Sequence, residues 1–187
     1  MRYILLTGLA FLMQVSCYAQ ASSQKYSFER QEPNHIYIDE NTFYSVEHPY
    51  GYDFNTSRYV NGAFYFSTKA SEGNYLITIQ VKAPDHVAGS FTLKAESRRL
   101  MLLNMPLEAG KNTTKTFLVN IKDKRIASGG EVKLKQREVS KLDWDDKLTI
   151  EFDGNHCSLQ TLTVTKMEKP IPTLYLAGNS TVVNQDN

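Results

Sequence analysis

The chain has 187 residues, of which 21 are Lys or Arg, 20 are Asp or Glu, and 41% are hydrophobic. The near-neutral charge argues against nucleic acid or an anionic membrane surface as the main partner, since both attract clusters of basic residues. The hydrophobic content excludes a disordered chain, and the 11 Tyr and 9 Phe residues favour strands over helices.

The first nineteen residues have the pattern of a secretory signal peptide. Arg2 gives a positive start, residues 3–15 are almost wholly apolar, and small residues ending at Ala19 offer a cleavage site. The apolar run of about 13 residues is shorter than the roughly 20 that a membrane-spanning helix needs. We therefore predict cleavage after Ala19 and a secreted or periplasmic protein with no membrane attachment after cleavage. Lipidation at Cys17 is the alternative, although the residues before it lack the usual Leu.

Residues 20–168 predict one β-sandwich module. Apolar and polar residues alternate in several runs, which are residues 75–82, 91–96, 117–121, 132–134, 148–152 and 162–164. Turn-forming residues separate the runs, at 71–74, 84–85, 108–110, 128–130 and 153–155. Alternation with a period of two places one set of side chains in a core and the other toward solvent. Many such runs without helical periodicity predict an all-β fold, an antiparallel β-sandwich or jelly roll.

The pattern changes after residue 168. Prolines at 170 and 172 make residues 169–172 a stiff, extended linker. The apolar run that follows, residues 173–177, does not alternate, which is typical of a strand buried on both faces in a parallel sheet. Such a strand needs neighbours on both sides. We therefore expect residues 173–187 to be the start of a second, α/β domain that this chain does not complete.

The apolar run ends in Gly178-Asn179-Ser180, an arrangement that can present a nucleophile. Glycine allows a sharp turn, and a serine at the start of a helix lies beside backbone N–H groups that can stabilise an oxyanion. The alternative is a serine that only caps a helix. Residues 170–182, which end in Gly-Asn-Ser-Thr-Val, resemble the opening of rhamnogalacturonan acetylesterases, a branch of the SGNH (GDSL-type) hydrolases. The resemblance implies that Ser180 is the nucleophile and that Gly178 and Asn179 form its turn. Asn179 departs from the family, which usually has Asp there.

The preceding module resembles the same branch. Residues 72–75, 95–102, 129–134 and 142–148 are similar to the N-terminal β-sandwich of secreted bacterial members, a galactose-binding-like jelly roll. The resemblance implies that the intact protein deacetylates pectin-type polysaccharide without a cofactor, and that its C-terminal hydrolase domain packs on the module. The family's catalytic His and Asp come from a C-terminal motif, and no His follows Ser180 here. We therefore expect the 187-residue chain alone to be inactive.

Two groups of aromatic residues are candidates for sugar binding. Tyr50 and Tyr52 lie in an aromatic-rich segment, residues 44–59, and exposed rings stack on sugars. The alternative, which we favour, is that these rings pack into the edge of the sandwich. Trp144 lies among acidic residues at 143, 145 and 146, which suggests a sugar or Ca²⁺ site. That spacing fits no standard metal loop, so we favour a packed Trp on an acidic turn and predict no metal.

Arg98 is a candidate for binding the carboxylate of a uronic acid, because a guanidinium can donate two parallel hydrogen bonds. Alternation along a strand would send Arg98 and Arg99 to opposite faces, so at most one is expected to be available. Besides the esterase interpretation, two alternatives stay open: a stand-alone glycan-binding module, and a structural domain without catalysis.

Overall fold

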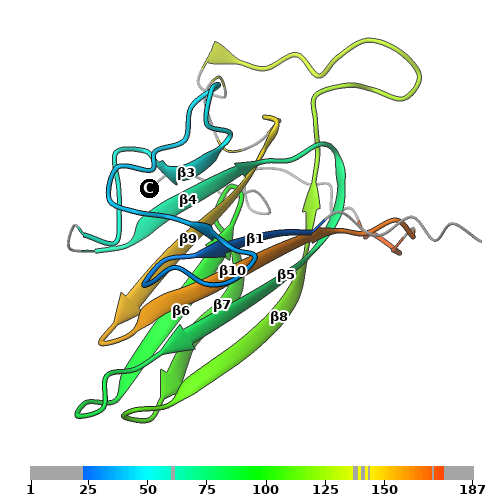
Figure 1. The fold of residues 1–187 in the computed structure, drawn as a ribbon. Helices are drawn as coiled ribbons and strands as arrows, with labels where there is room; N and C mark the ends of the chain where they lie inside the picture. The colour runs from blue at the N-terminus through cyan, green and yellow to red at the C-terminus, as the bar shows by residue number, and fades with distance from the viewer. Residues whose placement is uncertain are drawn as a thin grey trace, which may run out of the picture.

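The structure is a computed structural model that describes residues 23–59, 62–136, 139, 142, 144–169 and 171–174. Its strands form two five-stranded sheets packed face to face (Figure 1). Sheet A contains, in spatial order, β2 (Ile36–Tyr37), β1 (Ser23–Ser27), β10 (Ser158–Lys166), β5 (Gly73–Lys82) and β8 (Asn112–Ile121). Sheet B contains β3 (Tyr50–Asp53), β4 (Phe64–Lys69), β9 (Lys147–Asn155), β6 (Gly89–Ala95) and β7 (Arg99–Leu107). The described ranges contain no α-helix, and so none long and apolar enough to cross a membrane.

The predicted all-β sandwich is confirmed, and neighbouring strands are antiparallel except in the short β1–β2 pair. Alternation produces the core as expected. On β5, Ile77 and Ile79 are fully buried between the sheets, while Thr78 and Gln80 on either side of Ile79 face outward. Sheet B contributes Phe66 and Leu93 to the same core. Each such side chain contributes about 1.5–3 kcal/mol to folding through burial.

Two expectations about local structure were wrong. Residues 132–134 form no strand, and the chain there makes only an isolated bridge between Arg125 and Glu131. The turn expected at residues 153–155 lies later, because β9 continues to Asn155 and the chain reverses at His156, which has a φ of 49°. Strands β1, β2, β3, β4 and β7 lie outside the alternating runs that were expected, and the sequence of β7 does not alternate. Irregular pairing with β6 around Leu93 disrupts the period of two.

The topology defines two opposite ends of the sandwich. At the exit end, β10 finishes and the Met167 N–H donates a hydrogen bond of 2.8 Å to the Asn74 carbonyl at the start of β5. At the other end, the loop end, lie the β5–β6, β7–β8 and β9–β10 connections (Figure 1). Strand β10 has nine residues, so the two ends are separated by about 30 Å.

Candidate functional site

A pocket of about 360 Å³ opens at the loop end between the two sheets. We call it the loop-end pocket; it is lined by Glu29, Arg58, Tyr59, Gly62, Phe64, Phe152, Gly154, Cys157, Ser158 and Leu159. The segment that supplies Arg58 and Tyr59 begins with a tight turn. The Asp53 carboxylate accepts the Phe54 N–H at 2.8 Å, and the Asp53 carbonyl accepts the Thr56 N–H at 3.0 Å. This turn carries the chain out of β3 and places the two side chains at the pocket.

The Arg58 guanidinium makes an ion pair, a hydrogen bond and a contact with an aromatic ring in the pocket. Its Nη1 lies 2.5 Å from a carboxylate oxygen of Glu29, and its Nη2 donates a hydrogen bond of 2.7 Å to the Tyr59 hydroxyl. The guanidinium carbon lies 4.5 Å from the centre of the Tyr59 ring. The Arg58 Nε is buried and has no hydrogen-bond partner. An unsatisfied buried donor is costly, and because protein atoms cover this nitrogen, the groups of Arg58 and Glu29 that can meet a ligand are those on the pocket surface.

The rest of the pocket combines an apolar floor with a polar rim. Phe64, Phe152 and Leu159 form the floor and are buried, while the Tyr59 ring is 49% exposed. Glu29 and Ser158 add oxygen atoms at the rim. Ligand sites for small molecules have this composition, mostly apolar walls with a few convergent polar groups. An aromatic face beside a carboxylate and a guanidinium can stack on a sugar ring and bind its hydroxyl groups.

Cys157 lines the wall of the pocket, but its thiol is not a reactive group. Its thiol donates a hydrogen bond of 3.2 Å to the Ser90 carbonyl. Burial raises the pKa of the Cys157 thiol to about 11. The thiol therefore stays protonated near neutral pH and is a poor nucleophile.

The structure places Tyr50 and Tyr52 in the sandwich. Tyr52 is 1% exposed, and its ring centre lies 5.5 Å from that of Phe64, so no sugar can stack on it. Tyr50 packs against Tyr26 at 5.7 Å between ring centres. Both rings follow the packed alternative. Tyr59, from the same aromatic segment, supplies the ring at the pocket instead.

Trp144 and Arg98 also lie away from the loop-end pocket. Trp144 is partly buried and lines a separate hollow with Asp145 and Asp146, while residue 143 lies outside the described residues. Burial raises the pKa of Asp145. Within the described ranges, no three or more His, Cys, Asp or Glu residues are grouped so that they could hold a metal ion. Arg98 is exposed in the β6–β7 turn, whereas Arg99 donates a hydrogen bond of 2.7 Å to the Asn120 carbonyl of β8.

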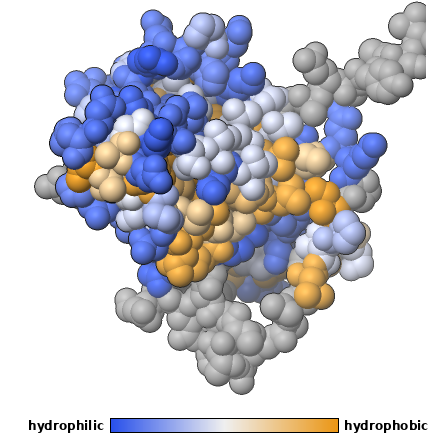
Figure 2. Space-filling view, turned by 90° about the horizontal axis from the view of Figure 1, so that it is seen from below, coloured by the Kyte–Doolittle hydropathy of each residue, from blue (hydrophilic) through white to orange (hydrophobic). Residues whose placement is uncertain are grey.

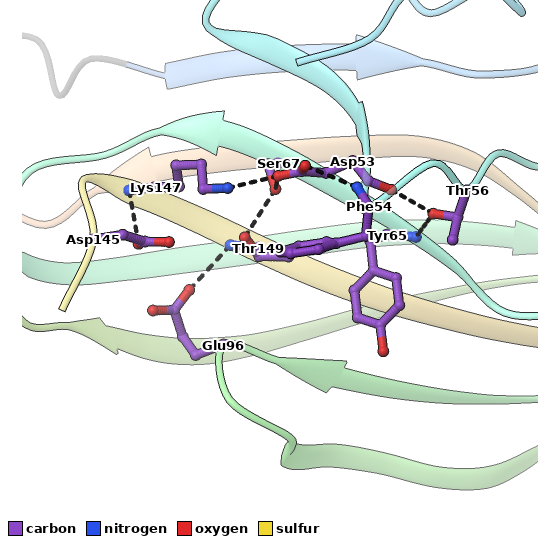
Figure 3. A network of polar contacts seen from close by, with 9 residues as sticks. All are labelled: Asp53, Phe54, Thr56, Tyr65, Ser67, Glu96, Asp145, Lys147 and Thr149. Carbon is purple, nitrogen blue, oxygen red and sulfur yellow. Dashed lines mark hydrogen bonds and ion pairs between the residues drawn. The ribbon is translucent and has the colours of Figure 1, made fainter. Parts of the chain in front are cut away.

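A polar network covers the outer face of sheet B (Figure 3). The Asp53 carboxylate binds the Lys147 ammonium and the Ser67 hydroxyl, each at 2.7 Å. Ser67 and the Thr149 hydroxyl lie 2.8 Å apart, and the Thr149 N–H donates to the Glu96 carboxylate at 3.0 Å. Burial would raise the pKa of Asp53, but hydrogen bonds from Lys147 and Ser67 outweigh it and lower the pKa. These groups satisfy one another, so the network joins β3, β4 and β9 and supports the turn that leads to Arg58.

The proposed nucleophile and its turn, Ser180, Gly178 and Asn179, lie outside the described residues, as does the predicted signal peptide.

Comparison with known proteins gives few matches. No protein-family model matches the sequence, and no curated protein is significantly similar to it. The crystal structure of the protein YxiM from Bacillus subtilis superimposes with a TM-score of 0.50 at 14% identity, covering 78% of this chain and 40% of that one. The C-terminal CBM6 of LamC, a marine laminarinase from Zobellia galactanivorans, gives a TM-score of 0.34 at 17% identity, covering 78% of this chain and all of that one.

The likeness to YxiM shows a shared fold alone, over a region that is 40% of the length of YxiM. The TM-score of the CBM6 domain is too low to carry an argument.

Proposed function

We propose that the β-sandwich is a glycan-binding module and that the loop-end pocket holds one sugar residue. The observation that carries this proposal is the combination of a half-exposed Tyr59 ring with the Arg58–Glu29 pair over an apolar floor. The apolar face of the sugar stacks on Tyr59, and its hydroxyl groups bond to the Glu29 carboxylate and the Ser158 hydroxyl. The pocket volume of about 360 Å³ is near the lower end for ligand sites, which suits a single small ring.

Affinity electrophoresis of the chain from residue 20 on pectic polysaccharide tests the proposal. We expect the polysaccharide to retard the protein, and we expect Tyr59→Ala to abolish the retardation because it removes the stacking surface. Phe43→Ala is the matched control, since Phe43 is similarly exposed, at 46%, but does not line the pocket. Equal retardation of the Tyr59→Ala variant and the parent would refute this site.

The resemblance of residues 170–182 extends the proposal to the intact protein. We propose that the module precedes an SGNH-type acetylesterase domain that removes acetyl groups from pectin-type polysaccharide. In that domain the Ser180 hydroxyl attacks the ester carbonyl, and a His oriented by a carboxylate accepts its proton. Those partners would have to follow residue 187. In a longer chain, Ser180→Ala should abolish acetate release from acetylated pectin, and retained release would exclude Ser180 as the nucleophile.

An apolar surface supports the packing of such a domain on the module. Leu100 and Leu103 on β7 and Leu118 on β8 are 53%, 67% and 44% exposed. Figure 2 shows apolar residues gathered in a band on the side of the sandwich where β7 and β8 are its edge strands. Exposed apolar surface that is contiguous can mark an interaction site. We call this surface the apolar edge.

The position of the linker supports the packing of a following domain beside this surface. Asn120 on β8 connects the apolar edge to the exit end, where the linker begins. Its side-chain amide donates a hydrogen bond of 3.0 Å to the side-chain oxygen of Asn74. Its backbone carbonyl accepts a hydrogen bond of 2.7 Å from Arg99 on β7. From Met167 to Thr173 an extended chain reaches at most about 20 Å. The irregular pairing and Pro106 of β7 disfavour addition of another strand. We therefore propose side-chain packing of the hydrolase domain against the apolar edge.

A further inference from the structure

Two more hollows adjoin the loop-end pocket. A middle hollow of about 400 Å³ shares Glu29, Cys157 and Ser158 with the loop-end pocket. A third hollow of about 280 Å³ shares Glu29, Lys82 and Gln160 with the middle one and lies on the outer face of sheet A. The three hollows therefore lie next to one another around Glu29, and we call them together the Glu29 groove. It runs from the gap between the sheets onto sheet A.

The strand pairing explains why polar side chains line this groove. Lys82 on β5 pairs with Ser158 on β10 and with Asn112 on β8, so the three lie side by side in one row across the sheet. A bulge at Gln160 interrupts the alternation of β10 between the inward-facing Leu159 and Leu162. Bulges turn a side chain to a new direction, and Gln160 consequently lines the groove and donates a hydrogen bond of 2.7 Å to the Ser158 hydroxyl.

The two carboxylates of the groove form short ion pairs, whereas its lysine forms only a long one. The Glu29 carboxylate is 2.5 Å from Arg58, and the Glu32 carboxylate is 2.8 Å from Arg30. The Lys82 side chain is 47% exposed, and its ion pair with the highly exposed Asp85 is long, at 4.0 Å. An exposed pair of this length contributes little, so the Lys82 charge is available to a ligand.

We infer that the Glu29 groove binds successive residues of an extended acidic polysaccharide, with one sugar on Tyr59 and the carboxylate of a neighbouring uronic acid on Lys82. This inference rests on the proposed glycan-binding function and assigns its substrate class. The side-chain amides of Gln80, Asn112 and Gln160 bind the hydroxyl groups of the sugar beyond Lys82. The groove lies about 30 Å from the exit end, where the linker to the proposed catalytic domain begins.

Titration calorimetry of the chain from residue 20 with galacturonate and its oligomers of two, three and four residues tests the groove. We expect affinity to rise up to the trimer and then to level off, since the groove has three hollows. We expect Lys82→Gln to lower the affinity for the trimer about 3- to 5-fold, the size of one exposed ion pair. The variant should bind the methyl-esterified trimer as the parent does. Lys25→Gln is the matched control, because Lys25 is exposed on β1 of the same sheet and does not line the groove.

The outcomes separate the two proposals. Binding of a single sugar that Tyr59→Ala abolishes, with no gain for longer oligomers and no effect of Lys82→Gln, would overturn the groove and leave the loop-end pocket intact. A length-dependent gain that Lys82→Gln does not reduce would overturn the carboxylate contact. Absence of binding to any of these glycans would overturn both proposals. Unchanged unfolding temperatures of the variants would show that the losses are not due to misfolding.

Discussion

The Asp53→Asn substitution tests whether the network on sheet B stabilises the fold. Asp53 makes three short hydrogen bonds, to Lys147 and Ser67 at 2.7 Å and to the Phe54 N–H at 2.8 Å, in a site where its side chain is 18% exposed. Hydrogen bonds to a charged group contribute about 1.5–3 kcal/mol each. The amide keeps one acceptor oxygen but loses the charge, so we expect a loss of about 2 kcal/mol in the free energy of unfolding at neutral pH. For a domain of this size the unfolding temperature should fall by about 6 °C.

The pH dependence gives the test a second readout. The folded-state pKa of Asp53 is lowered, so its contribution is fully present above the unfolded pKa of about 3.9 and is lost as the pH falls through the folded value. The stability difference between the parent and Asp53→Asn, measured by urea denaturation, should therefore shrink below about pH 4. Asp153→Asn is the control, since Asp153 is exposed on β9 of the same sheet. Equal destabilisation by the two variants, or a difference that does not change with pH, would refute this role of Asp53.

Three other predictions follow from the packing. Ile79→Ala should lower the free energy of unfolding, measured by urea denaturation, by about 3–4 kcal/mol because Ile79 is fully buried. Thr116→Ala, on the exposed face, should lower it by less than about 0.5 kcal/mol. Similar losses for the two variants would contradict the assigned core. Burial raises the pKa of Cys157 to about 11. At pH 8 its alkylation by iodoacetamide should therefore be at least about 100-fold slower in the folded protein than in urea. Equal rates would show that the folded protein has an accessible thiolate. In an intact protein with the hydrolase domain, Leu118→Asp should split one calorimetric unfolding transition into two. Val46→Asp is the control and should leave a single transition, because Val46 is 92% exposed. A single transition in both variants would exclude packing on the apolar edge.

The strands that alternate regularly could be predicted from the sequence. Residues 75–82 and 117–121 lie in β5 and β8, which pair over ten consecutive residues without a shift. The unpredicted strand β7 pairs irregularly, so its Leu and Met residues do not alternate. The opposite error occurred at residues 132–134, where a short alternating run has no strand to pair with. Alternation reports the faces of a strand, but it does not show that a partner strand exists.

The sequence predicted which types of residue could form the candidate site, but not which individual residues do. An aromatic-rich segment suggested rings for sugar binding, yet the sequence does not tell which ring is exposed. Tyr50 and Tyr52 are two residues apart on β3 and therefore share the inward face, whereas Tyr59 follows the turn after β3 and reaches the loop end. The groove depends on Glu29, Lys82 and Gln160, which are far apart in the sequence and carried no motif.

The sequence by itself determined the β-sandwich class and the core positions of the regularly alternating strands β5, β6, β8, β9 and β10, because a period of two is a local property that each strand expresses independently. It also carried the resemblance from which Ser180 is proposed as a nucleophile. Only the tertiary structure decided where ligands can bind. The order β1-β10-β5 in sheet A brings Glu29, Ser158 and Lys82 together, and the loop after β3 adds Arg58 and Tyr59 from the other sheet. Strand order and the packing of one sheet on the other are non-local, so no stretch of the sequence encodes this site alone.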